Sequence, residues 1–174
     1  MPARRAAAGA GGASHAGAEP SSRGAADTAG LIRGFLTRHA FNHLLGLELV
    51  RTHKDGLTIQ CRLKPEFMNT GGTLHGGVTA SVADAAVGSA IHHHFAGTRR
   101  FTTVELKVNY FRPVTEGRLI ARAHLVRIGS SIVVGRVDLT DSHRKSVGIA
   151  IVTYMFTDTT PARPSTTKRA IRSR

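Results

Sequence analysis

The chain has 174 residues, of which 41% are hydrophobic and 5% aromatic, with a single cysteine and a formal net charge of +13. That length suits one domain with residues to spare for tails, and one cysteine excludes an intramolecular disulfide and any multi-cysteine metal site. The positive charge favours an anionic ligand, but no interleaved aromatic residues indicate a nucleic-acid partner.

Both ends of the chain are predicted to be disordered tails. Residues 1–30 are rich in Ala, Gly and Ser, residues 157–174 are rich in Thr, Pro and Arg, and neither segment has hydrophobic periodicity. The folded domain is then predicted over residues 31–156. Because no apolar run approaches the roughly 18 residues of a membrane span and no secretory signal is evident, we expect a soluble, cytoplasmic protein without a membrane partner.

From residue 31 onward the hydrophobic pattern changes element by element. Apolar residues at helical spacing over 31–43 predict a helix. Two alternating runs, 45–53 and 57–63, are joined by Asp55 and Gly56 and predict a β-hairpin. A long run rich in Ala and Val over 76–95 predicts a helix. Four strand-like runs follow, over 101–111, 118–128, 131–141 and 146–156.

This order of elements predicts an α+β fold in which a mainly antiparallel sheet wraps one central helix. Cys61 lies in an apolar alternating run, which favours a buried, inert thiol over a catalytic one. His92, His93 and His94 point in different directions on a helix. We therefore interpret them as a polar helix end and expect no metal site.

Asp84 stands in a run of small apolar residues on the predicted central helix. Burying a charge is costly unless it is compensated. Its helical neighbours, which include Ala80 and Gly88, form a small apolar face suited to close contact with something else. From this pattern alone, a catalytic carboxylate and a solvent-facing polar residue are equally supported.

The start of the same helix is a second candidate site. Gly76 and Gly77 follow His75, where free backbone N–H groups and the positive end of the helix dipole can hold a developing anion. Glycines also let a substrate approach the backbone closely. A Gly-rich turn before a helix is the alternative, and this short motif alone does not exclude it.

The spacing of the two candidates predicts how they work together. Gly76 and Asp84 are eight residues apart, which is about 12 Å along a helix. Reacting groups must come within about 3–3.5 Å, so one acyl carbonyl cannot easily contact both groups of the same helix. If both act, Asp84 comes from a second subunit, which predicts an obligate homodimer with two shared active sites.

Together these residues resemble a known family. Asn69, His75 to Gly77, and Asp84, followed by Thr103 and the run 109–113, agree in order and spacing with hot-dog thioesterases of the phenylacetate-degradation (PaaI) type. The resemblance covers residues 40–156 and implies the hot-dog fold and the hydrolysis of aryl- or fatty-acyl-CoA. It also implies a homodimer, commonly paired into a homotetramer, and no cofactor, because CoA is part of the substrate.

The resemblance implies catalytic roles for five residues. Asp84 would act as the nucleophile or as the general base on water, and the Gly76 amide would polarise the thioester carbonyl as an oxyanion hole. Asn69 would position the water or the substrate, and His75 would orient the thioester region or support its loop. Thr103 would hold the water, with the preceding threonine as the alternative.

For the CoA moiety the resemblance implies contacts at the tyrosine of the run 109–113 and in the hairpin over 127–131. A basic residue beside a glycine turn suits the CoA phosphates. Relatives commonly have Arg or Lys after the hairpin glycine, where this chain has Ser130, so Arg127 or Arg112 would compensate. The predicted substrate-binding residues are Gly77, Tyr110, Arg112, Arg127, Gly129, Ser130 and Ser131.

Two other functions remain open from the sequence. A hot-dog hydratase or dehydratase acting on acyl thioesters would also pair a loop histidine with a helix carboxylate across subunits. A non-catalytic acyl-CoA-binding or nucleic-acid-binding module would use the positive charge without chemistry. Asn69 and the motif from His75 to Gly77 favour hydrolysis, and release of free thiol from a saturated acyl-CoA would distinguish it from both.

Overall fold

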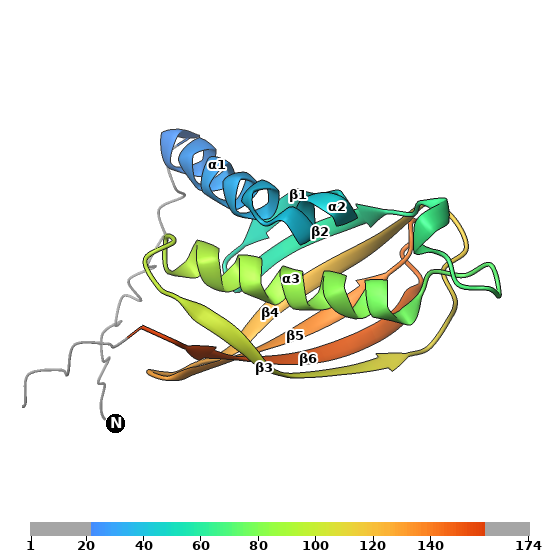
Figure 1. Cartoon of the computed structure of the whole chain (residues 1–174). Helices are drawn as coiled ribbons and strands as arrows, with labels where there is room; N and C mark the ends of the chain where they lie inside the picture. Colours follow the sequence, from blue (N-terminus) through green and yellow to red (C-terminus); the bar gives the residue numbers. More distant parts are fainter. Residues whose placement is uncertain (1–21, 159–174) are drawn as a thin grey trace, which may run out of the picture.

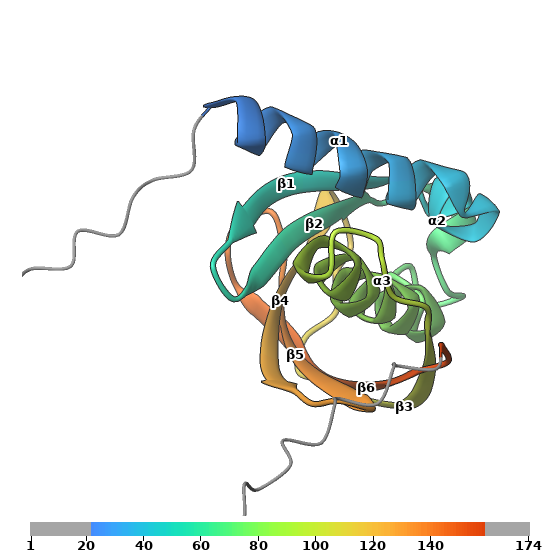
Figure 2. The ribbon, with the colours of Figure 1, turned by 90° about the vertical axis from the view of Figure 1, so that its left-hand side faces the viewer.

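A long helix, α3 (Gly76–His94), lies in the hollow of a six-stranded antiparallel sheet (Figures 1 and 2). This computed structural model describes residues 22–158. The strand order β1-β2-β4-β5-β6-β3 around one helix confirms the predicted hot-dog fold. The other elements are α1 (Ser22–Arg38), α2 (Ala40–Leu45), β1 (Leu47–His53), β2 (Gly56–Arg62), η1 (Pro65–Phe67), β3 (Phe101–Tyr110), β4 (Arg118–Ile128), β5 (Ile132–Thr140) and β6 (Ser146–Phe156).

The predicted hairpin forms at the chain positions that its turn residues indicate. His53 pairs with Gly56 across the turn that holds Asp55. A side chain at position 56 is excluded, because a Cβ there would lie 2.1 Å from the carbonyl oxygen of Ala123 on β4. Glycine therefore lets the hairpin pack directly against the next strand of the sheet.

The central helix is buried on most of its surface because the sheet and α1 surround it (Figure 2). Ala83, Ala86 and Ile91 are fully buried. The helix and sheet come very close at one point, since a Cβ at Gly135 of β5 would lie only 2.6 Å from Val87 Cγ1. Small residues on both surfaces therefore set the distance between α3 and the sheet.

The helix predicted over 31–43 is wrong in its extent. It begins at Ser22 and stops at Arg38. His39 has an extended backbone and begins the separate helix α2, which ends at Gly46 in the left-handed conformation. Residues 22–30, predicted as tail, are thus helical, while the predicted tail segments 1–21 and 159–174 lie outside the described residues.

The interpretation of the three histidines as a polar helix end is wrong for His92. Its ring is buried under α1 and stacks on Phe35, with the ring centroids 4.3 Å apart, and burial lowers its pKa. The structural interpretation of Cys61 is confirmed. The thiol is fully buried, and burial raises its pKa to about 11, so Cys61 is not a reactive thiolate at neutral pH.

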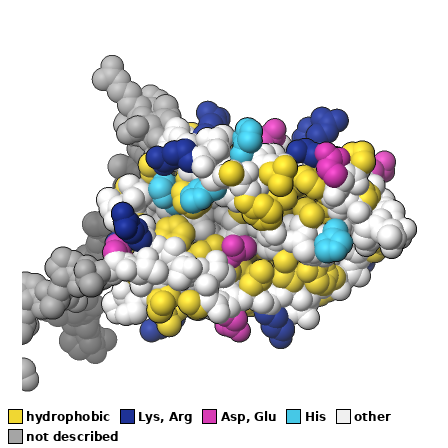
Figure 3. Space-filling model, in the orientation of Figure 1, with side chains coloured by type: hydrophobic (Ala, Val, Ile, Leu, Met, Phe, Trp, Pro, Cys, Tyr) yellow, Lys and Arg dark blue, Asp and Glu magenta, His cyan; other side chains and the backbone are white. Residues whose placement is uncertain are grey.

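One surface of the molecule combines an unpaired strand edge with exposed apolar side chains. Within residues 22–158, β3 pairs only with β6 and leaves its other edge open. Its Leu106 and Tyr110 are exposed, as are Phe41 (57%) and Leu44 (61%) on α2. Figure 3 shows hydrophobic side chains in two rows on the face that carries α3, with a hollow between them. Open edges and apolar patches of this kind are typical of surfaces that bind another chain.

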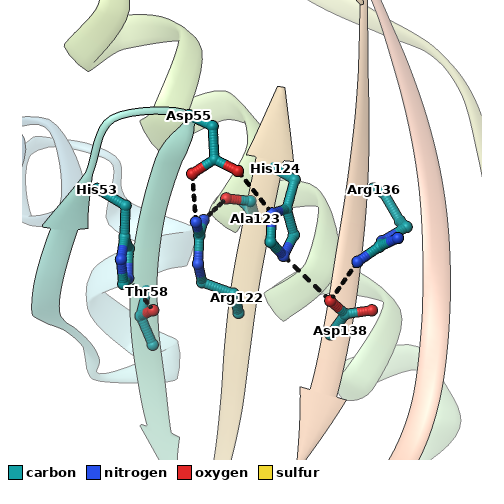
Figure 4. Close-up of polar contacts among 8 residues, drawn as sticks. All are labelled: His53, Asp55, Thr58, Arg122, Ala123, His124, Arg136 and Asp138. Carbon is teal, nitrogen blue, oxygen red and sulfur yellow. Dashed lines mark hydrogen bonds and ion pairs between the residues drawn. The ribbon is translucent and has the colours of Figure 1, made fainter. Parts of the chain in front are cut away.

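The outer face of the sheet carries a row of polar side chains that runs from the β1–β2 turn across β4 and β5 (Figure 4). Asp55 accepts hydrogen bonds from Arg122 and from His124, whose Nδ1 lies 2.7 Å from its Oδ2. The other ring nitrogen of His124 lies 3.0 Å from Asp138, which also pairs with Arg136 at 2.8 Å. The hydrogen bonds from His124 and Arg122 lower the pKa of Asp55 from 3.8 to about 2.

Replacing Asp55 by asparagine should change how stability depends on pH. Because the pKa of Asp55 is depressed by folding, its ionised form stabilises the wild type above pH 3.8, and this contribution is lost as the pH falls through about 2. The difference in melting temperature between wild type and D55N should therefore shrink over this interval. Thermal unfolding at a series of pH values measures it, and parallel curves for the two proteins would contradict the prediction.

Within the described residues no helix combines the length and the apolar character needed to cross a membrane.

Candidate active site

The loop before α3 is organised by the side chain of Asn69. Its Oδ1 accepts hydrogen bonds from the backbone N–H groups of Gly71 (2.9 Å) and Thr73 (3.1 Å). Its Nδ2 donates to Thr73 Oγ1 at 2.9 Å. Asn69, predicted to position water or substrate, thus shapes the loop, and its second amide hydrogen has no recorded acceptor within residues 22–158.

His75 satisfies most of the free donors at the start of α3. Its Nδ1 accepts a hydrogen bond from the N–H of Gly77 at 2.9 Å. Its carbonyl oxygen accepts from the N–H groups of Val78 (3.0 Å) and Thr79 (3.2 Å). Among the described residues, no acceptor is recorded for the N–H of Gly76. The first turn of the helix therefore presents one free donor, at the residue predicted to form the oxyanion hole.

Tyr110 and Arg112 lie at the same end of the molecule as Gly76. The Tyr110 hydroxyl donates to the carbonyl oxygen of Gly76 at 2.9 Å, and Arg112 donates to the carbonyl oxygen of Ser146 at 3.2 Å. These residues line a pocket of about 340 Å³ that also includes Thr79. Tyr110 therefore contacts the helix start directly, and Arg112 lines the same pocket as Gly76.

Asp84 lies half-buried farther along α3 and contacts both β3 and β6. Its Oδ1 accepts hydrogen bonds from Thr103 Oγ1 and from the hydroxyl of Tyr154, each at 2.9 Å. Thr103 and Tyr154 are paired across the two strands. The contact to Asp84 is made by the threonine at 103 and not by the one before it. Within the described residues, no hydrogen-bond partner is recorded for Asp84 Oδ2.

Tyr154 was not predicted from the sequence. Its hydroxyl lies 2.9 Å from both Oδ1 and the backbone oxygen of Asp84. Burial and the negative charge of Asp84 raise its pKa, so the hydroxyl remains a donor at neutral pH. The sequence does indicate that Tyr154 faces inward on its strand, and a buried tyrosine hydroxyl needs a polar partner. The identity of the partner depends on the register of β6 against β3 and on how α3 lies over them.

The remaining predicted substrate-binding residues lie at the other end of the sheet. Ser131 accepts a hydrogen bond from Phe156 at 2.9 Å, and Phe156 pairs with Phe101 at the start of β3. Tyr110 is the last residue of that strand, nine residues away, which is about 30 Å in extended chain. Within one chain, the structure therefore separates Tyr110 from the four predicted hairpin residues. These are Arg127, Gly129, Ser130 and Ser131.

The two candidate catalytic groups also open into different pockets. Gly76 borders the pocket beside Tyr110, whereas Asp84 borders a separate pocket of about 270 Å³. Their separation along α3 is about 12 Å, as the sequence predicted. Among the described residues, no group of three or more His, Cys, Asp or Glu side chains is placed to hold a metal ion.

Comparison with known proteins identifies the family. The family model named thioesterase superfamily matches residues 71–147. The medium/long-chain acyl-CoA thioesterase YigI of Escherichia coli (strain K12) is 32% identical over 136 residues, covering 70% of this chain and 88% of that protein. The chain therefore belongs to the thioesterase superfamily and is an enzyme of the thioester-hydrolase class.

Solved structures agree with this fold. The PaaI protein from the phenylacetic acid degradation operon of E. coli matches with a TM-score of 0.69 at 16% identity, covering 76% of this chain and 95% of that chain. A thioesterase from Haemophilus influenzae matches with a TM-score of 0.68 at 22% identity, covering 72% of this chain and 88% of that chain. At these identities the likeness concerns the fold alone.

Proposed function

We propose that this enzyme hydrolyses acyl-CoA to a free acid and CoA in active sites shared between two subunits. The observation that carries the proposal is that α3 presents, within the described residues, one hydrogen-bond donor without an acceptor, Gly76 N–H, and one carboxylate oxygen without a partner, Asp84 Oδ2. Hydrolysis of a thioester is helped by a hydrogen-bond donor that stabilises charge on the carbonyl oxygen and by a base that activates water. The activity named for the E. coli relative YigI supports acyl-CoA as the substrate.

In the proposed mechanism Asp84 acts as a general base. Asp84 Oδ2 takes a proton from a water molecule held beside the Thr103 hydroxyl, and the water oxygen attacks the thioester carbonyl carbon. The carbonyl electrons move to its oxygen, where the Gly76 N–H stabilises the negative charge. When the carbonyl re-forms, the C–S bond breaks and its electron pair leaves with sulfur, which takes the proton held by Asp84 to give free CoA and the ionised base.

Sharing of each site between two chains follows from the separation of these groups. Gly76 and Asp84 of one helix are too far apart to contact the same carbonyl, so Asp84 of one subunit would act with Gly76 of the other. The open edge of β3 and the exposed apolar residues beside α3 supply a surface for this dimer. A homodimer of this kind brings the two half-sites together.

The same arrangement accounts for the predicted CoA contacts. Tyr110 and Arg112 lie about 30 Å from the hairpin that holds Arg127 and Ser130 in the same chain. In a dimer, the helix-start group of one subunit and the hairpin of the other would lie along one bound CoA. The exposed guanidinium of Arg127 would then pair with a CoA phosphate.

The test is release of free thiol from a panel of saturated acyl-CoAs and from phenylacetyl-CoA. We expect one thiol per substrate molecule consumed at neutral pH, with turnover well above the rate without enzyme. An α,β-unsaturated acyl-CoA serves as the control for the hydratase alternative. Loss of its double bond without release of thiol, together with inactivity on every saturated acyl-CoA, would contradict hydrolysis.

A further inference from the structure

The pocket beside Asp84 has walls from five elements of the fold. It has a volume of about 270 Å³. Asp84, Ala85 and Gly88 of α3 form one wall, and the facing walls carry aromatic rings. These rings come from α1, α2, β3 and β6, and they are Phe35, Phe41, Phe101 and Tyr154.

The aromatic wall is rigid because its rings pack on one another. Phe101 meets Tyr154 edge to face, with centroids 5.4 Å apart and an interplanar angle of 86°. Phe35 lies 6.3 Å from Phe101 and is stacked on the buried ring of His92 from behind. Because Phe35, Phe101 and Tyr154 are held by these ring contacts, this part of the pocket wall is formed before any ligand enters.

The wall that α3 contributes consists of residues with small side chains or none. Ala85 and Gly88 leave the pocket open against α3. A Cβ at Gly88 would lie 2.9 Å from the Tyr154 hydroxyl, the group that also holds Asp84. Tyr154 therefore closes the pocket at Gly88 and fixes the carboxylate at its side. The remaining polar lining residues, His39 and Asn42, come from the more exposed junction of α1 and α2.

We propose that this pocket holds the acyl chain of the substrate and selects straight chains of medium length. The inference rests on the proposed hydrolysis, since it requires the thioester carbonyl to lie at Asp84. Rings and small side chains suit a hydrocarbon, whereas the amides of the CoA arm need hydrogen-bond partners. At protein packing density a methylene group fills about 27 Å³, so the pocket has room for about ten carbons.

The experiment measures kcat/KM for saturated acyl-CoAs from C2 to C16, with phenylacetyl-CoA included, by thiol release. For the wild type we expect kcat/KM to rise with chain length up to about C8–C10 and then to stop rising. Ala85→Leu fills the pocket from the helix side and should shift this limit to shorter chains by about three carbons. The ratio of kcat/KM for C10 to kcat/KM for C4 should therefore fall relative to the wild type.

Phe41→Ala is the second variant, because Phe41 is 57% exposed and its truncation leaves the core intact. It should lower kcat/KM for C8–C10 by about tenfold more than for C4 through the lost apolar contact, so the ratio of the two values is the measurement. The matched control is Leu44→Ala, an equally exposed residue of α2 that does not line the pocket. This control should keep the wild-type chain-length profile.

The outcomes separate the pocket from the hydrolytic function. Thiol release from no acyl-CoA of any length would overturn the proposed function itself. Hydrolysis with a flat chain-length profile, or with a profile that neither A85L nor F41A changes, would overturn the pocket assignment alone. A preference for phenylacetyl-CoA over every straight chain would also overturn it, because the pocket would then select aromatic acyl groups.

Discussion

Replacing Asp84 by asparagine should lower kcat/KM for acyl-CoA by about a thousandfold, the usual contribution of a general base. The substitution is structurally conservative here because Thr103 and Tyr154 both donate to Oδ1. The asparagine oxygen can take that position and accept both hydrogen bonds. Its NH2 group then replaces the free oxygen Oδ2, which removes the base and leaves the packing unchanged. Steady-state thiol release and the melting temperature measure the two effects.

The control for D84N is the same substitution at Asp55. This carboxylate lies in the ion-pair row on the outer face of the sheet (Figure 4), away from α3. D55N should keep wild-type kcat/KM at neutral pH, whatever its effect on stability in acid. Near-wild-type turnover by D84N would remove Asp84 from the mechanism.

Replacing Gly76 by proline should lower kcat by about 100- to 1,000-fold, because it deletes the one free donor at the helix start. Proline is well tolerated as the first residue of a helix, and His75 already has φ −60° and ψ 134°, which suit a residue before proline. Gly76→Ala is the matched control, since it keeps the N–H. Its Cβ would lie 3.4 Å from Tyr110, an ordinary contact, so G76A should retain most of the activity.

Mixing the two inactive variants tests whether the sites are shared. If Gly76 of one subunit works with Asp84 of the other, a dimer of one D84N chain and one G76P chain holds one intact site. After unfolding and refolding an equal mixture, about a quarter of wild-type activity should return, because half of the dimers are mixed. No recovery, with mixed dimers present by mass spectrometry, would place both groups in one chain.

Much of the fold could be predicted because local signals were strong. Asp55 and Gly56 between alternating runs determine a hairpin whatever surrounds them, and the Ala-rich run after Gly76 favours only a helix of that length. The break at His39 was not predictable in the same way. Residues 31–43 have helical spacing throughout, and the position of the break is where Phe35 and His39 meet, with ring centroids 4.6 Å apart.

The parts of the site that depend on residue spacing within one helix could be predicted. The parts that depend on how strands pair with one another could not. The distance between Gly76 and Asp84 follows from helix geometry. The contact of Thr103 with Asp84 required the path of β3 across α3, and Tyr154 required in addition the pairing of β6 with β3. The opposite positions of Tyr110 and Arg127 likewise depend on strand order. Such long-range relations are not encoded in any local pattern.

The contact between Gly135 and Val87 has a consequence for mutational scans of this enzyme. Any side chain at position 135 must push α3 outward or displace Val87, since a Cβ there would already lie 2.6 Å from Val87 Cγ1. The same helix carries Gly76 at its start and Asp84 within it, so both half-sites would move together. A screen scored by turnover would rank position 135 with the reacting residues although it touches no substrate. Stability therefore has to be measured beside activity before a sensitive position is assigned to the chemistry.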